Sequence, residues 1–141
     1  MKCAIRIAAL LLLAGSAAGE AATIEAERLW NATMIQVVAG HRYRFEARGR
    51  WEDSHISTDP DGYTSPSWLL RRSEWMRRAP DANWFVLICS VDFDEDLLFV
   101  IGSGRTLLMP RSGLLTCFAN DVKSMYWNNR GAVELTVTEV E

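Results

Sequence analysis

The loop at residues 120–131 carries the side chains best suited to hold a cation. It contains one carboxylate, from Asp121, and three side-chain amides, from Asn120, Asn128 and Asn129. Calcium accepts six to eight oxygen ligands at relaxed geometry and combines carboxylate, amide and main-chain oxygens in one site. The same residue types also form ordinary turns between strands, and an Asn-Arg-Gly end fits a hairpin. Two interpretations are therefore open, a calcium site with little charge or a plain turn.

Short strand-like runs surround this loop and would position it. Apolar or alternating residues precede it at 114–118 and follow it at 132–140. The run at 42–51 alternates most regularly, which predicts a strand with one face on a core and one in water. The run at 84–89 is the most apolar and predicts a strand at the centre of a sheet. About eight such runs predict an all-β fold, an antiparallel β-sandwich of the jelly-roll or galactose-binding type.

One segment, residues 67–78, departs from the strand pattern and predicts a short helical or irregular insertion. Trp68, Arg72 and Trp75 would share one side of such a helix. These three residues either form an aromatic and basic lip that binds a sugar or another planar ligand, or cover one end of the sandwich. Before the insertion, the sequence Asp-Pro-Asp-Gly at 59–62 predicts a tight turn.

The first 22 residues have the pattern of a secretion signal. Two basic residues flank the start of an apolar run at 5–14, and small residues then offer cleavage points after Ala18 or Ala22. The apolar run is too short to cross a bilayer as a helix of the mature protein. We therefore expect an exported protein, periplasmic or secreted, with residues 1–22 as signal peptide and residues 23–141 as a single domain without a membrane span.

Charge and cysteine content exclude some classes of function. Removal of the signal takes the formal net charge from −3 to −4, which gives no electrostatic reason to expect nucleic acid binding. Cys89 and Cys117 remain, and in an exported chain they either form a disulfide or stay free inside apolar strands. Neither these cysteines nor the two histidines have the spacing of a zinc site. The sequence also shows no nucleophile motif or phosphate-binding glycine loop, so it predicts no enzyme.

The pattern Asn-Asp-Val-x-x-x-Tyr-x-Asn-Asn-x-Gly at 120–131 resembles the calcium site of the PA-I galactophilic lectin family. Members of that family are small β-sandwich proteins that bind galactosides through a bound Ca²⁺. Less specific likenesses precede the pattern in the same order and cover most of the mature chain. They include Val38-Ala39-Gly40, the Asp-Pro-Asp-Gly turn and Ser112-Gly113-Leu114.

The resemblance implies a set of ligands. Asp121, Asn128 and Asn129 match the side-chain ligands of the family's calcium, while Met125 and Ser54 match positions that supply main-chain carbonyls. Two sugar hydroxyls complete the shell of the ion in the family. The ligand-binding residues implied or predicted for this chain are Asp121, Asn128, the backbone of Val122, and the insertion residues Trp68, Trp75 and Arg72.

The chain also departs from the family. The family's His and Gln that select the sugar have no matching pair between Gly62 and Asp81, where this chain has a longer segment rich in Trp and Arg. Trp127 and Met125 replace smaller loop residues and would crowd the saccharide position. Calcium binding is therefore better supported by the resemblance than galactose binding.

Together these features predict an exported, calcium-dependent, lectin-like protein that binds a saccharide or glycoconjugate without turnover. A homo-oligomer, which would add avidity, is left open by the sequence. The alternative from another class is a structural or interaction module of the cell envelope. In that alternative calcium only sets the shape of the loop or is absent.

Overall fold

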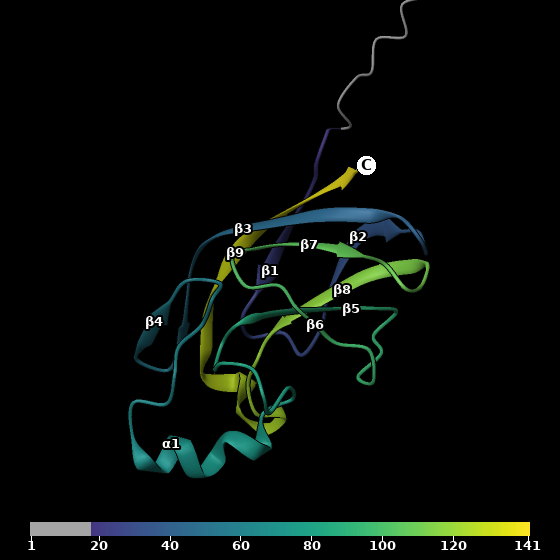
Figure 1. Cartoon of the computed structure of the whole chain (residues 1–141). Helices are drawn as coiled ribbons and strands as arrows, with labels where there is room; N and C mark the ends of the chain where they lie inside the picture. The colour runs from purple at the N-terminus through teal and green to yellow at the C-terminus, as the bar shows by residue number, and fades with distance from the viewer. Residues whose placement is uncertain (1–17) are drawn as a thin grey trace, which may run out of the picture.

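The computed structural model describes residues 18–141, so most of the predicted secretion signal lies outside the described part of the chain. These residues form an all-β sandwich of two antiparallel sheets, which confirms the predicted fold class (Figure 1). The first sheet has the order β1-β9-β3-β4, with β7 also paired to β3. Its strands are β1 (Glu20–Glu25), β3 (Arg42–Asp53), β4 (Ile56–Thr58), β7 (Gly104–Leu108) and β9 (Asn129–Val140).

The second sheet has the order β2-β8-β5-β6 and faces the first across the core. Its strands are β2 (Asn31–Val37), β5 (Leu87–Val91), β6 (Phe99–Val100) and β8 (Gly113–Ala119). Three short helical elements complete the described chain: α1 (Trp68–Ser73), and the 3₁₀ turns η1 (Glu74–Met76) and η2 (Lys123–Asn128). Within residues 18–141, no helix is long and apolar enough to cross a membrane.

Strand β3 shows why the sequence pattern specifies the sheet. Tyr43, Phe45, Ala47 and Trp51 are buried, and the arginines between them are exposed, as the alternation predicts. The strand pairs with β9 along its whole length, from Arg42 opposite Val140 to Asp53 opposite Asn129. Because a one-residue slip would turn the buried set toward water, this register is strongly specified. The pairing places the last residue of β3 beside the first residue of β9.

The core between the sheets includes the disulfide between Cys89 and Cys117. These cysteines lie directly opposite each other on β5 and β8, the two central strands of the second sheet. Both side chains are fully buried. The structure thus selects the bonded alternative that the sequence had left open.

The tight turn at 59–62 forms as predicted. The Gly62 N–H donates to the Asp59 carbonyl at 3.1 Å, and Gly62 has a φ of +73°. A Cβ at this position would lie 2.1 Å from the Trp84 carbonyl oxygen. Glycine is therefore required twice here, by its backbone conformation and by the close approach of a neighbouring strand segment.

Strand β1 bears on where a secretion signal could end. It includes residues 20–22, which the sequence pattern assigned to the signal, and pairs them with β9. Cleavage after Ala18 leaves the whole strand in the mature protein, whereas cleavage after Ala22 removes three of its six residues. The signal itself stays a prediction.

The helical elements and the chain ends lie at opposite poles of the sandwich. Figure 1 shows α1 and the turn before β9 at one pole, with the C-terminus and the beginning of β1 at the other. The predicted calcium loop becomes η2, between β8 and β9, and so belongs to the α1 pole.

Candidate functional site

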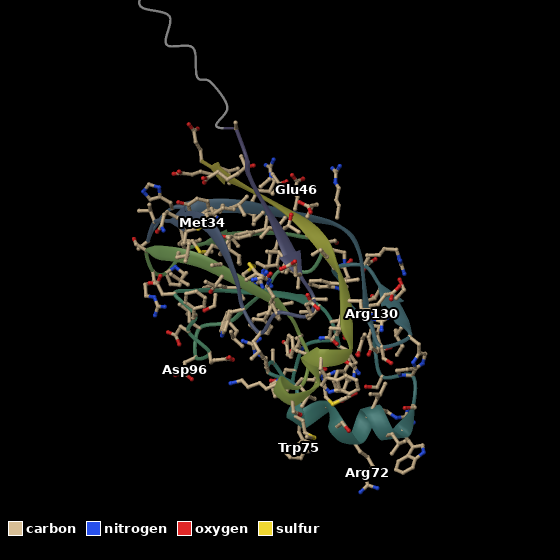
Figure 2. All side chains as sticks on the ribbon, turned by 180° about the vertical axis from the view of Figure 1, so that it is seen from behind. Met34, Glu46, Arg72, Trp75, Asp96 and Arg130 are labelled. Atoms are coloured by element: carbon tan, nitrogen blue, oxygen red, sulfur yellow. A yellow bond between two sulfur atoms is a disulfide. The ribbon has the colours of Figure 1, made fainter. Side chains whose placement is uncertain are left out.

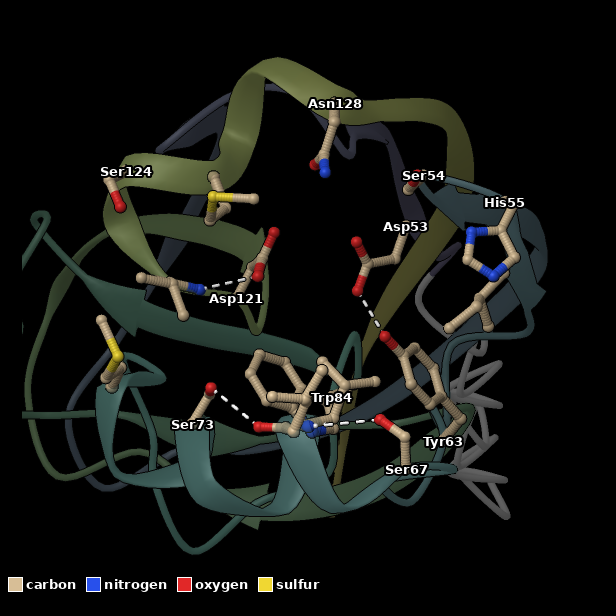
Figure 3. Close-up of a pocket in the computed structure, with 16 residues that line it drawn as sticks. Asp53, Ser54, His55, Tyr63, Ser67, Ser73, Trp84, Asp121, Ser124 and Asn128 are labelled. Atoms are coloured by element: carbon tan, nitrogen blue, oxygen red, sulfur yellow. Dashed lines mark hydrogen bonds between the residues drawn. The ribbon is translucent and has the colours of Figure 1, made fainter.

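A cavity of about 490 Å³ opens at the α1 pole (Figure 3). The β3–β4 turn, the α1–η1 segment and η2 surround it. Five of the six residues predicted at the calcium site or from its loop line this cavity: Ser54, Asp121, Val122, Met125 and Asn128. Four of them come from the loop before β9, and Ser54 comes from a distant part of the chain. The sixth, Asn129, lies behind Asp121 and is bonded to it.

Asp121 is buried and accepts a hydrogen bond at each carboxylate oxygen. It follows β8 by two residues and is only 2% exposed. Its Oδ1 accepts a hydrogen bond from the Val122 N–H at 2.7 Å, and its Oδ2 accepts one from the Asn129 Nδ2 at 3.0 Å. Asn129 Nδ2 donates in turn to the Ala26 carbonyl at 3.2 Å. The carboxylate is therefore held in one orientation before any ligand arrives.

Two amide oxygens at the site have no hydrogen-bond partner within the described residues. They are Asn128 Oδ1 and Asn129 Oδ1, and both are buried. A buried acceptor without a donor costs about 1–3 kcal/mol, so such atoms call for an explanation. A hard cation would satisfy both oxygens, because neutral amide oxygens are ordinary calcium ligands. The residues present thus fit the implied ion on donor chemistry.

Asp53 adds a second carboxylate that the sequence reasoning missed. It is the last residue of β3, lines the cavity and accepts a hydrogen bond from the Tyr63 hydroxyl. Figure 3 shows the side chains of Asp53, Asp121 and Asn128 pointing into the same space. A signal for it existed, because alternation from the buried Trp51 places Asp53 on the same face of β3. The site therefore has two acidic groups where the loop alone predicted one.

The two carboxylates influence each other's ionisation. Burial, and then the negative charge of Asp53, raise the pKa of Asp121 to about 6. Burial also raises the pKa of Asp53, against the hydrogen bond from Tyr63. Both shifts mean that the protein alone does not offset the cost of burying the two negative charges. A divalent cation would supply that compensation, although residues 18–141 contain no group of three or more His, Cys, Asp or Glu side chains placed to hold a metal.

Ser54 connects the two segments that carry the polar side chains of the cavity, the β3–β4 turn and η2. These two segments form the polar wall of the cavity. It adopts a φ of +55°, and its N–H donates to the Asn128 carbonyl at 3.2 Å. The β3–β4 turn is thereby fixed to the end of η2. The predicted roles of the Ser54 and Met125 carbonyls as calcium ligands stay predictions, with both residues placed at the cavity.

Asn120, the third amide of the loop, has a structural role. Its side chain is fully buried and accepts from the Ala79 N–H at 3.0 Å. Its Nδ2 donates to the carbonyls of Ala79, Ala82 and Asn83 at 2.9, 3.2 and 2.9 Å. Asn120 therefore fixes the loop at 79–83 and does not line the cavity.

The insertion residues predicted as a stacking lip lie elsewhere. Residues 67–78 do form a short helix followed by a 3₁₀ turn, but Trp68, Arg72 and Trp75 are not among the residues that line the cavity. Trp68 and Trp75 are 58% and 74% exposed, and the Arg72 guanidinium lies 5.6 Å from the Trp68 ring centroid. Figure 2 shows Arg72 and Trp75 pointing away from the sandwich. The structure does not bring these three residues together with Asp121.

The opposite face of the insertion closes the cavity instead. Leu69, Leu70 and Met76 line it together with Trp84. The Ser67 hydroxyl caps α1 by accepting from the Leu70 N–H at 3.3 Å, which is the usual role of a serine at a helix start. Helical spacing alone could not show which face of so short a helix turns inward.

Arg78 joins the insertion to the polar wall. Its N–H donates to the Asp121 carbonyl at 3.1 Å. Its guanidinium pairs with Glu95 at 2.7 Å, lies over the Phe118 ring, and donates to the Tyr126 hydroxyl at 3.1 Å. The two walls of the cavity are thus bonded to each other directly behind Asp121.

Comparison with solved structures finds neighbours of the same fold. A solved structure titled "EclA N-terminal domain; PllA-like lectin" superposes with a TM-score of 0.65 and covers 85% of this chain and 95% of that chain. The chain has a lectin-like fold. The identity is 18%, so the likeness concerns the fold alone. No protein-family model matches the chain, and no curated protein matches it. The resemblance to the PA-I family accordingly stays a prediction.

Proposed function

We propose that this protein binds a saccharide through a calcium ion held at the cavity of the α1 pole. One observation carries the proposal: two carboxylates, Asp53 and Asp121, and Asn128, whose buried amide oxygen has no partner within the described residues, line one cavity at the end of a lectin-like sandwich. Asn129, which is hydrogen-bonded to Asp121, adds a second unpartnered amide oxygen next to them. The solved neighbour is a lectin by its printed name, which supports the same class of function.

Asp121, Asn128 and Asn129 would hold the ion, and Asp53 would add negative charge beside it. When bound, calcium offers open coordination positions that a pair of sugar hydroxyls takes in place of water. The carboxylates of Asp121 and Asp53 can accept hydrogen bonds from those hydroxyls, and such charge-assisted bonds are stronger than neutral ones. Binding of this kind needs no catalytic group, which agrees with a lectin that releases its ligand unchanged.

The alternative is a cell-envelope module in which calcium only fixes the shape of the pole. The unpartnered amide oxygens would serve that role equally well. The two functions differ in what chelation removes. A lectin loses saccharide binding with chelator, whereas a structural module loses stability and has no saccharide to lose.

Thermal unfolding of residues 19–141 with excess calcium and with chelator tests the metal first. A ligand that binds only the folded state at about 100 times its Kd adds about 2.7 kcal/mol, or roughly 10 °C in Tm for a domain of this size. Glycan-array binding with and without chelator then tests the saccharide. No Tm shift at millimolar calcium would overturn the metal site, and a shift without any glycan signal would favour the structural module.

A further inference from the structure

We propose that the α1 pole docks onto an anionic phospholipid bilayer, with exposed tryptophans in the headgroup region and exposed arginines of α1 at the lipid phosphates. The tryptophans are Trp68, Trp75 and Trp127, and we call them the tryptophan rim. None of the three lines the cavity. The inference therefore goes beyond the proposed function and requires neither calcium nor a saccharide.

The first argument is the concentration of exposed apolar side chains at this pole. Within residues 18–141, twelve large hydrophobic residues are exposed, and six of them belong to α1, η1 and η2. The six are the tryptophan rim, Leu69, Met76 and Met125. Trp127 is 79% exposed, even more than Trp75. Single exposed apolar residues are common, but a gathered group of them marks an interaction surface.

The second argument is that the tryptophan rim extends over two elements. Trp68 and Trp75 belong to the α1–η1 segment, whereas Trp127 belongs to η2. Figure 1 shows α1 and the turn before β9 together at one pole, and Figure 2 shows Trp75 pointing away from the sandwich. A bridge between Arg77 and Val122 joins the insertion to the residue before η2. A broad surface that approaches this pole therefore meets side chains of both elements.

The third argument is charge. The chain is acidic as a whole, with a formal net charge of −3, yet residues 67–78 contain four arginines and one glutamate. Arg71 and Arg72 are exposed, and neither forms an ion pair with another residue of the described chain. The glutamate, Glu74, accepts a hydrogen bond from the Ser65 hydroxyl at 2.5 Å. Free positive charge thus lies beside the exposed tryptophans and complements an anionic surface.

A phospholipid bilayer matches the apolar and the basic groups at once. Tryptophan favours the membrane–water interface, because its ring is apolar and its indole N–H donates to headgroups. Arginine keeps its guanidinium in water while its stem lies along apolar groups, and it binds phosphate through two parallel hydrogen bonds. The Arg72 guanidinium lies 5.6 Å from the Trp68 ring centroid, so the two kinds of group are neighbours on α1. Surfaces that combine tryptophan or leucine with basic residues are typical of interfacial membrane binding.

Vesicle flotation tests the proposal with residues 19–141 in the presence of chelator. One set of vesicles contains phosphatidylcholine and phosphatidylglycerol at about two to one, and the other contains phosphatidylcholine alone. Neither contains a glycolipid, so the proposed calcium and saccharide site plays no part. We expect affinity for the anionic vesicles to be about tenfold higher at low salt, and high salt to remove most of that difference by screening.

Tryptophan variants test the apolar part of the contact. Trp75→Ala should lower the affinity for anionic vesicles about tenfold, and Trp75→Ala combined with Trp127→Ala should lower it about 100-fold. Both side chains are exposed, so neither change should prevent folding. Met34→Ala is the matched control, because Met34 is 82% exposed and lies away from the α1 pole in Figure 2. Its affinity should equal that of the unmodified chain.

Arginine variants test the charged part. Arg71→Gln combined with Arg72→Gln should bring the affinities for anionic and neutral vesicles to within about twofold of each other. Arg44→Gln combined with Arg48→Gln removes the same charge from the exposed face of β3 and is the matched control. This control should keep the preference for anionic vesicles, because β3 lies outside the docking surface.

The outcomes decide the proposal separately from the proposed function. Absence of flotation with both vesicle types, or flotation that the tryptophan variants leave unchanged, would overturn bilayer docking and leave the calcium site untouched. Sedimentation without lipid tests a second copy of the chain as the partner. A dimer that Trp75→Ala abolishes would assign the tryptophan rim to self-association and would likewise overturn bilayer docking.

Discussion

The two walls of the cavity are built in different ways. On the β3–η2 wall, Asp121 and Asn129 are buried and bonded, and Asp53 is bonded to Tyr63. On the α1–η1 wall, no residue of either helical element is buried, and Trp75 and Leu69 are largely exposed. One wall is an extension of the sheets, whereas the other is a short insertion between β4 and β5.

Under the proposed function, this difference between the walls has a physical reason. An ion requires several oxygens at defined positions, and residues fixed by strands and buried hydrogen bonds provide that precision. Apolar contact has no direction, so a less constrained wall with Leu and Met side chains can provide it. The comparison teaches that affinity for the ion should depend on single atoms of the first wall, while the second wall should tolerate change without affecting the ion.

The largest expected effect is a loss of calcium affinity when the β3–η2 wall loses a carboxylate. Asp121→Asn keeps the shape of the side chain but removes its charge, so we expect calcium affinity to fall by more than about 100-fold. Calorimetric titration of calcium measures the effect. Asp96→Asn is the control, because Asp96 is an exposed carboxylate in the turn before β6. A calcium isotherm for Asp121→Asn that matches the unmodified chain would remove the proposed site.

The second effect tests the bond between the walls. Arg78→Ala removes an ion pair to Glu95, the cover over Phe118 and a hydrogen bond to Tyr126, and its side chain is only 1% exposed. We expect a loss of about 3 kcal/mol in the free energy of unfolding, measured by urea denaturation. Arg72→Ala removes an exposed guanidinium of the same segment and should change stability by less than about 0.5 kcal/mol. Similar losses for both variants would show that Arg78 does not anchor the insertion.

The third effect is a dependence of protein stability on pH, which arises from Asp121 in the β3–η2 wall. In chelator, the pKa of Asp121 is about 6 in the folded protein and 3.8 as a free group, so the folded state binds more protons between these values. Stability should therefore fall by about 2 kcal/mol as pH rises from 4 to 6, and change little above that window through this group. Urea denaturation at several pH values, with Asp121→Asn as reference, isolates the effect.

Calcium should reverse that pH dependence. The ion binds the charged carboxylates, so calcium affinity should increase as pH rises through about 6. Asp53→Asn should shift the transition to lower pH, because the charge of Asp53 contributes to the raised pKa of Asp121. A transition at the same pH in that variant would show that the two carboxylates do not interact.

The smallest effect is expected at the outer face of the second wall. Trp75→Ala removes a side chain that points away from the cavity, so calcium and glycoside affinities should stay within about twofold of the unmodified chain. Calorimetry with calcium and then with a bound glycoside measures both. A marked loss of glycoside affinity would show that this tryptophan contacts ligand after all and would restore the stacking lip.

Much of the fold could be predicted from the sequence, because its signals are local. The alternation in β3 and the Asp-Pro-Asp-Gly turn each determine their own structure. The two-sheet arrangement follows from the number of short strands. The disulfide could not be decided, because Cys89 and Cys117 become neighbours only through the register of β5 and β8.

The site was predicted only in part, for the same reason. The loop before β9 contains Asp121 and Asn128, which the resemblance implied as ligands, and the structure places both at the cavity. Their role as ligands stays a prediction. Asp53 was missed because its contribution depends on the pairing of β3 with β9, far away in sequence. Trp68, Arg72 and Trp75 were placed at the ligand because helical periodicity shows which residues share a face but not where that face points.

The position of the cavity, at the opposite end of the sandwich from both chain ends, also decides how the molecule can be tethered. Glu20 pairs opposite Val137 near the C-terminus, so both ends of the described chain leave from the same pole, far from α1. Attachment through either end, to a sensor surface, a label or a neighbouring domain, would present the cavity outward. Several copies fixed in this way on one support would all face the same direction, ready to engage a surface that displays many ligands at once.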